Sequence, residues 1–129
     1  MRWGLRRVLG AALCLSPLGL ALASLFCALA APRPETALGL APAALGLAIT
    51  GLNFHLSFIR PAWRRRQGKP EHHVSGLPIV SHLFMLGALS MGFGALYTSL
   101  ATVATAALDT GGTLWLLVWT WKDESFWNG

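Results

Sequence analysis

The stretch that decides the fold is VSGLPIVSHLFMLGALSMGFGALYTSLATVATAAL, from Val74 to Leu108. It holds no Asp, Glu, Lys or Arg over 35 residues, and as a single helix it would be about 52 Å long. A membrane's hydrocarbon core, about 30 Å thick, needs only about 20 apolar residues to be crossed. The stretch is therefore too long for one crossing and predicts two membrane-spanning helices, with a turn near Tyr97, Thr98 and Ser99.

The composition favours a membrane protein along the whole chain. Of the 129 residues, 54% are hydrophobic and 12% are charged, against roughly 25% charged residues in an ordinary soluble domain. A soluble domain of this size needs a polar surface, whereas a bilayer lets apolar side chains point outward. The sequence predicts a single all-α domain, an integral membrane bundle of about four transmembrane helices.

The helices are expected at about residues 8–31, 37–59, 77–98 and 101–121. Residues 32–36 separate the first two, because proline disfavours helix in the residue before it. The stretch 60–73 is expected to be a cytoplasmic loop, since it holds five basic residues and two prolines. The last helix is expected to be broken near Asp109, because Gly111 and Gly112 follow it and favour a turn.

The first helix has an alternative interpretation. A basic start, an apolar stretch and Ala-x-Ala sites at residues 21–23 and 28–30 also fit a cleaved secretory signal. The uncharged run from Val8 to Ala31 exceeds the roughly 7–15 residues of a signal's apolar core, which favours a retained helix. On such a helix Cys14 and Cys27 would lie about 20 Å apart, too far for a disulfide, so they are expected to be packing residues.

The net charge of +5 is concentrated beside apolar runs, which favours anionic lipid over nucleic acid as a partner. With the amino terminus inside, nine of the ten basic residues are cytoplasmic and Arg33 alone is outside. Eight arginines against two lysines, with much Ala, Gly and Leu, indicate a GC-rich bacterial genome. We therefore expect a multi-pass protein of the cell (inner) membrane with both termini cytoplasmic. The residues expected to contact anionic lipid are Arg60, Arg64, Arg65, Arg66 and Lys69.

Small and polar residues form a stripe on each of the first two helices, at alternating spacings of four and three. This period is typical of left-handed packing, in which small side chains let backbones approach closely. The stripes predict that the helices pack on each other or on a partner. Their members are Gly10, Cys14, Pro17, Ala21, Ser24 and Ala28, and Gly39, Ala43, Gly46, Thr50, Asn53 and Ser57.

Asp109 is the sharpest functional candidate. An aspartate near a helix centre costs about 2.5–3.5 kcal/mol on insertion scales, so it usually faces the bundle interior and often marks a proton or ion path. The alternative is structural, because Asp109 with Thr110, Gly111 and Gly112 can cap a half-helix that leads into Trp115. The candidate polar site consists of Asp109, Asn53, His82 and His55.

The four histidines are all expected near the cytoplasmic interface. His55 lies five residues before Arg60 and His82 about five residues into the third helix, so these two can approach each other, with Glu71, His72 and His73 nearby. Histidine with carboxylate suits a transition metal or a proton relay. No His-x-x-x-His or Cys-x-x-Cys spacing supports a metal, so no metal ligand or cofactor is assigned. The simpler interpretation is four interfacial histidines that bond to backbone.

Three short motifs occur in the second half of the chain. They are His-Val-Ser-Gly-Leu-Pro-Ile at 73–79, Leu-Gly-Ala-Leu at 86–89 and Leu-Asp-Thr-Gly-Gly at 108–112. The chain thereby resembles small predicted bacterial membrane proteins of unknown function, in which a basic loop precedes Ser-x-[Ile/Leu]-Pro and Leu-Asp-[Pro/Thr]-Gly begins the last segment. Ser81 and His82 depart from that pattern, which has glycines there. The resemblance implies a multi-pass fold and no particular activity.

No phosphate loop, nucleophile elbow or Ser/His/Asp set occurs in the sequence, so an enzyme is not expected. The first expectation is a non-enzymatic accessory or assembly subunit, which packs through its small-residue faces on other membrane subunits or on itself. The alternative is a small transporter or ion-conducting element that uses Asp109 with Asn53 or His82. A membrane-embedded metalloenzyme comes third.

Overall fold

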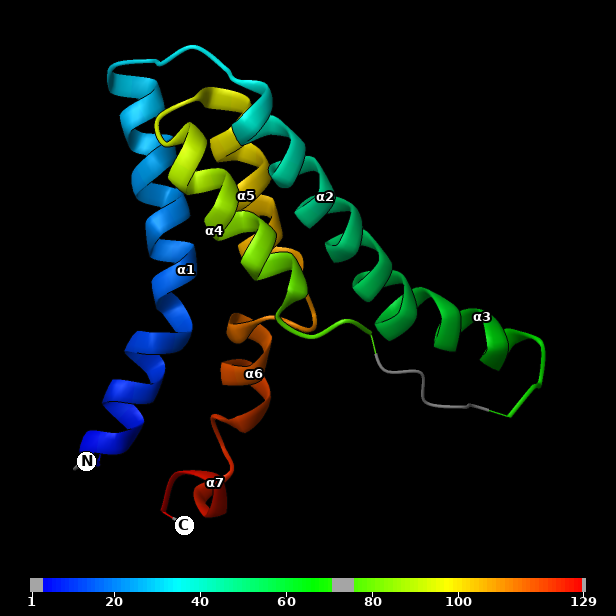
Figure 1. Ribbon diagram of the computed structural model, residues 1–129. Helices are drawn as coiled ribbons and strands as arrows, with labels where there is room; N and C mark the ends of the chain where they lie inside the picture. The colour runs from blue at the N-terminus through cyan, green and yellow to red at the C-terminus, as the bar shows by residue number, and fades with distance from the viewer. Residues whose placement is uncertain (1–3, 71–75, 129) are drawn as a thin grey trace.

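The computed structural model describes residues 4–70 and 76–128, and these form a bundle of helices (Figure 1). Within these ranges the chain forms no strand, only an isolated bridge between Arg33 and Ala95. Three continuous or nearly continuous helical segments are long and apolar enough to cross a membrane: Leu5–Ala30, Ala37–Arg66 and Leu96–Thr120. The predicted all-α membrane bundle is confirmed.

The first crossing is α1 (Leu5–Ala30), and the second begins with α2 (Ala37–Phe54). The hydroxyl of Thr36 accepts a hydrogen bond of 3.1 Å from the backbone N–H of Gly39, which is the bond expected of an N-cap. The short segment between the helices agrees with the predicted boundary. Helix α1 packs mainly on the later helices α5 and α6, so it is a structural member of the bundle.

The basic stretch 60–73 is helical in its first half, so the predicted loop is wrong there. Helix α2 continues through a π-helical turn, η1 (His55–Ile59), into α3 (Arg60–Arg66). In this turn the Arg60 N–H bonds to the His55 carbonyl, five residues back. Pro61 has no N–H to give, and the wider turn makes room for its ring. Arginine is also a good helix former, which favours continuation to Arg66.

The long uncharged stretch divides earlier than predicted. Helix α4 covers Val80–Gly92 and α5 covers Leu96–Leu108, so the break lies at residues 93–95 rather than at 97–99. Gly94 has a φ of +83°, which glycine adopts without the cost that a side chain would bring. The break is therefore placed by a glycine rather than by a change in polarity.

Glu35 fixes the start of α5 from the turn before α2. Its carboxylate accepts hydrogen bonds from the backbone N–H of Tyr97 (2.5 Å) and Thr98 (3.4 Å) and from the Thr98 hydroxyl (2.8 Å). An anionic cap is favourable at a helix N-terminus because the first N–H groups have no partner within the helix. The cap also ties the turn at residues 31–36 to the turn at residues 93–95.

The last crossing is broken where the sequence predicts it. Helix α5 ends at Leu108, residues 109–112 are not helical, and α6 (Thr113–Thr120) completes the crossing before the short α7 (Glu124–Asn128). Helix α4 has 13 residues, about 20 Å, and the non-helical residues 76–79 lead to its start. The two ends of the chain lie together at one end of the bundle (Figure 1).

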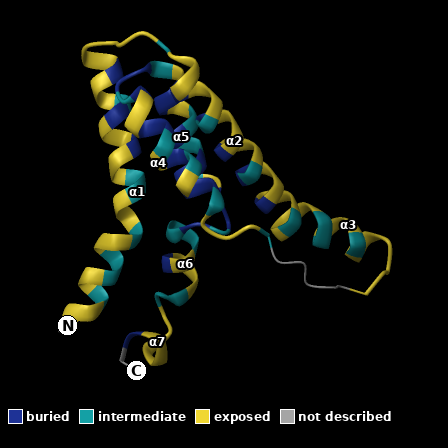
Figure 2. Ribbon diagram, in the orientation of Figure 1, coloured by how far each residue is buried: buried dark blue, intermediate teal, exposed yellow. Residues whose placement is uncertain are grey.

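The buried residues lie where the helices face one another (Figure 2), and about half of them are polar, whereas many large apolar residues are exposed. Helices α4 and α5 lie between α1 and α2, and a small apolar core forms around Met85, Leu89 and Ala106. This arrangement suits a bilayer, which leaves no advantage in burying apolar side chains. The buried polar residues are Ser24, Thr50, Asn53, Ser81, His82, Thr98, Ser99, Thr102, Thr105, Asp109 and Thr110.

The small-residue stripes are used within the chain. Ala21, Ser24 and Ala28 of α1 are buried, as are Gly39, Ala43, Gly46, Thr50 and Asn53 of α2. Helix α2 packs on α4 and α5, and α1 packs on α5 and α6, so the stripes contact the second half of the chain.

Alanine substitutions at two glycines of α4 should differ in their effect on stability, because only one of these glycines contacts α2 closely. A Cβ at Gly92 would lie 3.2 Å from the Gly39 Cα and 3.0 Å from the Thr98 Cγ2, whereas a Cβ at Gly87 would meet nothing within 4 Å. We expect Gly92→Ala to lower the free energy of unfolding by about 1–3 kcal/mol. Gly87→Ala should leave it unchanged or raise it by up to about 1 kcal/mol. Thermal unfolding in detergent, followed by circular dichroism, measures both changes. Equal effects of the two substitutions would contradict the close contact between α2 and α4.

Candidate functional site

Two non-helical segments meet inside the bundle. Residues 76–79 lead into α4, and residues 109–112 join α5 to α6 within the span Leu96–Thr120. The backbone N–H of Ile79 donates to the Gly111 carbonyl at 3.2 Å, so the segments are paired directly. Backbone that leaves a helix inside a membrane must find partners, because an unpaired N–H or C=O costs several kcal/mol in hydrocarbon. The surrounding side chains supply the other partners.

Asn53 of α2 pairs with both segments. Its Nδ2 donates to the Leu77 carbonyl at 3.1 Å, and its Oδ1 accepts from the Leu77 N–H at 2.8 Å, as a neighbouring strand would. The same Nδ2 donates to Oδ1 of Asp109 at 2.6 Å. A Cβ at Gly111 would lie 3.1 Å from this amide nitrogen, so a side chain there would crowd Asn53.

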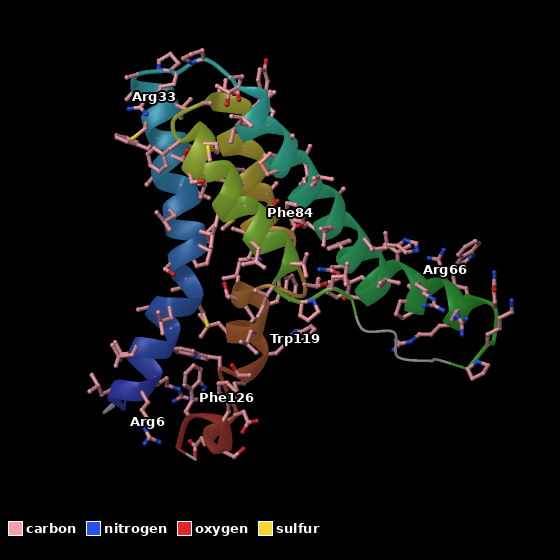
Figure 3. All side chains as sticks on the ribbon, viewed as in Figure 1. Arg6, Arg33, Arg66, Phe84, Trp119 and Phe126 are labelled. Carbon is pink, nitrogen blue, oxygen red and sulfur yellow. The ribbon has the colours of Figure 1, made fainter. Side chains whose placement is uncertain are left out.

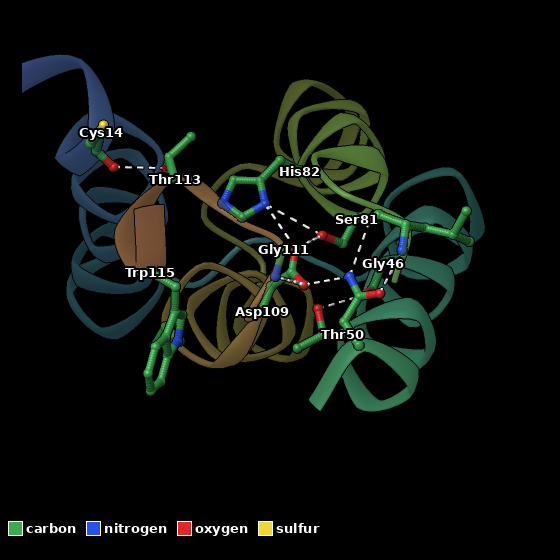
Figure 4. Close-up of polar contacts among 12 residues, drawn as sticks. Cys14, Gly46, Thr50, Ser81, His82, Asp109, Gly111, Thr113 and Trp115 are labelled. Atoms are coloured by element: carbon green, nitrogen blue, oxygen red, sulfur yellow. Dashed lines mark hydrogen bonds and ion pairs between the residues drawn. The ribbon is translucent and has the colours of Figure 1, made fainter. Parts of the chain in front are cut away.

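The Asp109 carboxylate is the centre of the site, and its side chain is fully buried. Its Oδ1 accepts from Asn53 and, at 3.2 Å, from the backbone N–H of Gly111. Its Oδ2 accepts from the Ser81 hydroxyl and lies 3.3 Å from Nδ1 of His82 (Figure 4). Four donor groups around one buried carboxylate are what a charge needs inside a membrane.

His82 adds a second ionisable group, and it is 3% exposed. Its Nδ1 faces Asp109 and lies 3.3 Å from the Ser81 hydroxyl. Its Nε2 is buried and has no hydrogen-bond partner among the described residues. A Cβ at Gly112 would lie 3.0 Å from this Nε2, so the glycine makes room for the imidazole ring. Buried polar atoms are nearly always paired, so Nε2 has the capacity for one more hydrogen bond, to a water molecule or a ligand.

The backbone at the start of α4 is strained. Ile79 has a φ of +68° and is the one non-glycine residue in the described ranges with a positive φ. A β-branched residue in this region costs of order 1–3 kcal/mol, and such residues cluster at functional sites. The strained residue is three positions before His82. It belongs to the segment 76–79, which is hydrogen-bonded to Asn53 and Gly111.

Hydrogen bonds from η1 and α1 also hold residues 109–113 in place. The Ser57 and Thr110 hydroxyls are hydrogen-bonded at 2.8 Å. The hydroxyl of Thr113 donates to the Cys14 carbonyl of α1 at 2.8 Å, on the other side of the break. Residues 109–112 are therefore fixed to the two outer crossings as well as to α4.

The structure brings together three of the four predicted site residues, Asp109, Asn53 and His82. His55 is exposed on η1, two positions beyond Asn53 and so about 200° around the helix, and the predicted approach of His55 to His82 is wrong. Glu71, His72 and His73 lie outside the described residues. In the part of the chain that the structure describes, no three His, Cys, Asp or Glu residues form a metal-binding group.

Sequence reasoning missed Ser81 and the Leu77 backbone as members of the site. Ser81 stood out only as a departure from a pattern that has glycine, and nothing in the sequence indicated that its hydroxyl points at Asp109. No protein-family model, curated protein or solved structure matches this chain. Its resemblance to small bacterial membrane proteins stays a prediction, and the function is argued from the site.

Asn53 is expected to contribute most to the stability of the site. Asn53→Leu leaves the Leu77 N–H, the Leu77 carbonyl and one Asp109 oxygen short of a partner, and each stranded group costs about 1–3 kcal/mol. Thr50→Val is the matched control, because Thr50 is also buried but bonds only to the Gly46 carbonyl of its own helix. Denaturant unfolding should show a large loss for Asn53→Leu and under about 1 kcal/mol for Thr50→Val. Similar losses would mean that the Asn53 bonds do not hold the segments.

Proposed function

We propose that this chain is a small proton-conducting transport element of a membrane, with Asp109 and His82 as its proton site. The observation that carries the proposal is a buried acid and base, 3.3 Å apart, where the break in the last crossing meets the non-helical start of α4. Breaks in membrane helices are typical of transport sites, and intramembrane ionisable residues typically mark proton or ion paths. The exposed apolar surface of the bundle is consistent with the lipid setting that this requires.

A purely structural cap explains the site less well. A neutral asparagine or threonine can cap a broken helix without the cost of a buried charge. The chain instead places a carboxylate against an imidazole, and the second imidazole nitrogen, Nε2, has no partner among the residues that the structure describes. A group that takes up and releases protons needs such an unused position.

The proposed step is a proton exchange between Asp109 Oδ2 and His82 Nδ1. A neutral His82 that carries its proton on Nε2 can take the Asp109 proton at Nδ1 and release the Nε2 proton to a water molecule. This leaves Asp109 as a carboxylate and His82 as the neutral Nδ1–H form, which donates to that carboxylate. The Ser81 hydroxyl donates to the same Oδ2 and so helps to hold the carboxylate beside His82.

The role of an accessory or assembly subunit has less support. That proposal relied on the small-residue stripes as surfaces for a partner. Most of the α2 stripe is buried against α4 and α5, and so are Ala21, Ser24 and Ala28 of α1. The faces that would recruit another subunit are used within the chain.

We further propose that both termini lie in the cytoplasm and that the membrane is the inner membrane of a bacterial cell. Arg6 lies at the end of the bundle that holds both termini, and Arg33 lies at the opposite end (Figure 3). Arg7, also at the terminal end, donates to the Trp121 carbonyl at 2.5 Å and lies over the rings of Trp121 and Trp127. Basic and tryptophan residues gathered at one face favour that face as the cytoplasmic interface.

Proton flux into proteoliposomes tests the proposed function. The purified chain should carry protons along an imposed potassium-diffusion potential, read by a trapped pH dye, above the rate of empty vesicles. Asp109→Asn removes the titrating group and should lower the flux at least tenfold. Asp123→Asn is the matched control, because Asp123 is a fully exposed acid beyond the last crossing, and it should conduct like the wild type. A wild-type flux equal to that of empty vesicles would contradict the proposal.

The basic helix α3 is expected to retain anionic lipid. Arg65, Arg66 and Lys69 are exposed, and α3 projects away from the helices that surround the site (Figure 1). Each basic residue near an anionic membrane surface contributes about 1 kcal/mol of attraction. Arg64→Gln, Arg65→Gln and Arg66→Gln together should lower the phosphatidylglycerol that native mass spectrometry finds on the extracted protein, with phosphatidylcholine unchanged. Equal retention of both lipids by both proteins would rule out this contact.

A further inference from the structure

A line of polar side chains runs along α5 from the site to the opposite end of the bundle. It consists of Thr98, Thr102 and Thr105, which spacings of four and three place on one face of α5, and of Asp109. Asp109 directly follows this helix, and its N–H still bonds to the Thr105 carbonyl. Each is at most 1% exposed, so the line is enclosed by the other helices. We call these four residues the α5 seam. Helix α2 adds the buried Thr50, one turn before Asn53.

The seam ends at a second carboxylate. Glu35 is half-buried, and its Oε2 accepts from the Thr98 hydroxyl at 2.8 Å. Thr98 itself lies under the closest crossing of α2 and α4, since Cβ atoms at Gly39 and Gly92 would come within 3.3 Å and 3.2 Å of its hydroxyl oxygen. The seam therefore joins Glu35, near the surface at the Arg33 end, to the buried Asp109.

We propose that the α5 seam is the proton path of the Asp109–His82 site and that Glu35 is the carboxylate through which protons pass at the Arg33 end. This inference rests on the proposed function, and it names the path and the outer proton-binding group. A hydroxyl can accept one proton while it donates another, so Thr98, Thr102 and Thr105 pass protons without changing their own state.

The spacing of the seam fits a path that includes water. Successive members are three or four residues apart, a rise of about 4.5–6 Å along the helix. That is longer than one hydrogen bond and about the length that one bridging water molecule covers. A proton would move from Glu35 to the Thr98 hydroxyl directly, and then through alternating water and hydroxyl groups to Asp109.

Packing is the competing explanation. Threonine in membrane helices often bonds to a carbonyl of its own helix, as Thr102 does to the Ser99 carbonyl at 2.9 Å. The two explanations predict opposite orders for two substitutions. Valine keeps the volume of threonine and removes the hydroxyl, whereas serine keeps the hydroxyl and removes a methyl group. A packing role therefore tolerates valine better, and a path tolerates serine better.

The test measures proton flux in proteoliposomes for the double variants Thr102→Val with Thr105→Val and Thr102→Ser with Thr105→Ser. We expect the valine pair to lower the flux at least tenfold and the serine pair to stay within about twofold of the wild type. Glu35→Gln, which keeps an oxygen for the Thr98 bond, should lower the flux at least fivefold. Thr120→Val is the matched control, because the Thr120 hydroxyl makes a similar bond to Leu116 outside the seam, and it should have no effect.

The outcomes separate this path from the proposed function. A silent wild type overturns both. A conducting wild type that loses its flux with Asp109→Asn, but keeps it in the valine pair and in Glu35→Gln, overturns the path alone. A serine pair that conducts less than the valine pair also overturns it, since only packing predicts that order. Thermal unfolding of each variant in the same detergent tests whether the variant is folded. If the double valine variant does not fold, the single variant Thr102→Val is measured in its place.

Discussion

The buried Asp109 carboxylate and its four donors are the interaction on which the rest of the structure depends. Inside a membrane, neither a charge nor unpaired backbone is tolerated without partners. Asn53, Ser81, His82 and the Gly111 N–H bring α2, α4 and the α5–α6 break to one point. Without that meeting point, residues 76–79 and 109–112 would leave several backbone groups unpaired.

This constraint also explains why the interior of the bundle is polar. In a bilayer, moving apolar side chains from lipid into the protein interior gains little free energy. Helix association therefore relies on close packing and on hydrogen bonds between helices. The α2–α4 crossing at Gly39 and Gly92 is an example of the first, and the Ser24–Ser99 bond of 2.7 Å between α1 and α5 is an example of the second. The glycines of the first example also lie against Thr98, so the close crossing of α2 and α4 is built directly beside one end of the α5 seam.

The sequence predicts the parts of this structure that depend on local pattern. Uncharged runs indicated the crossings, and the Asp-Thr-Gly-Gly motif at 109–112 indicated the break, because both signals lie within the segments that they describe. The Glu35 cap was not predictable, since it acts on Tyr97 and Thr98 more than sixty residues away. The start of α5 was therefore misplaced.

Only part of the site was predicted, because some of its residues are recognisable from the local sequence and others are not. Asp109, Asn53 and His82 stood out because a polar side chain in an apolar run needs a partner. His55 met the same criterion, but helix periodicity turns it away from Asn53. The prolines of the basic stretch predicted a loop, whereas the π turn η1 accommodates Pro61 and lets the helix continue. Ser81 was missed because its role depends on a contact with Asp109, 28 residues along the chain.

The central claim is that Asp109 exchanges a proton within the membrane. Infrared difference spectroscopy of the reconstituted protein between high and low pH tests it most directly, because a protonated carboxyl has its own stretching band. The account predicts a carboxyl band that appears reversibly as the pH falls and is missing in Asp109→Asn but present in Asp123→Asn. A spectrum in which Asp109→Asn removes no titrating band would contradict the account.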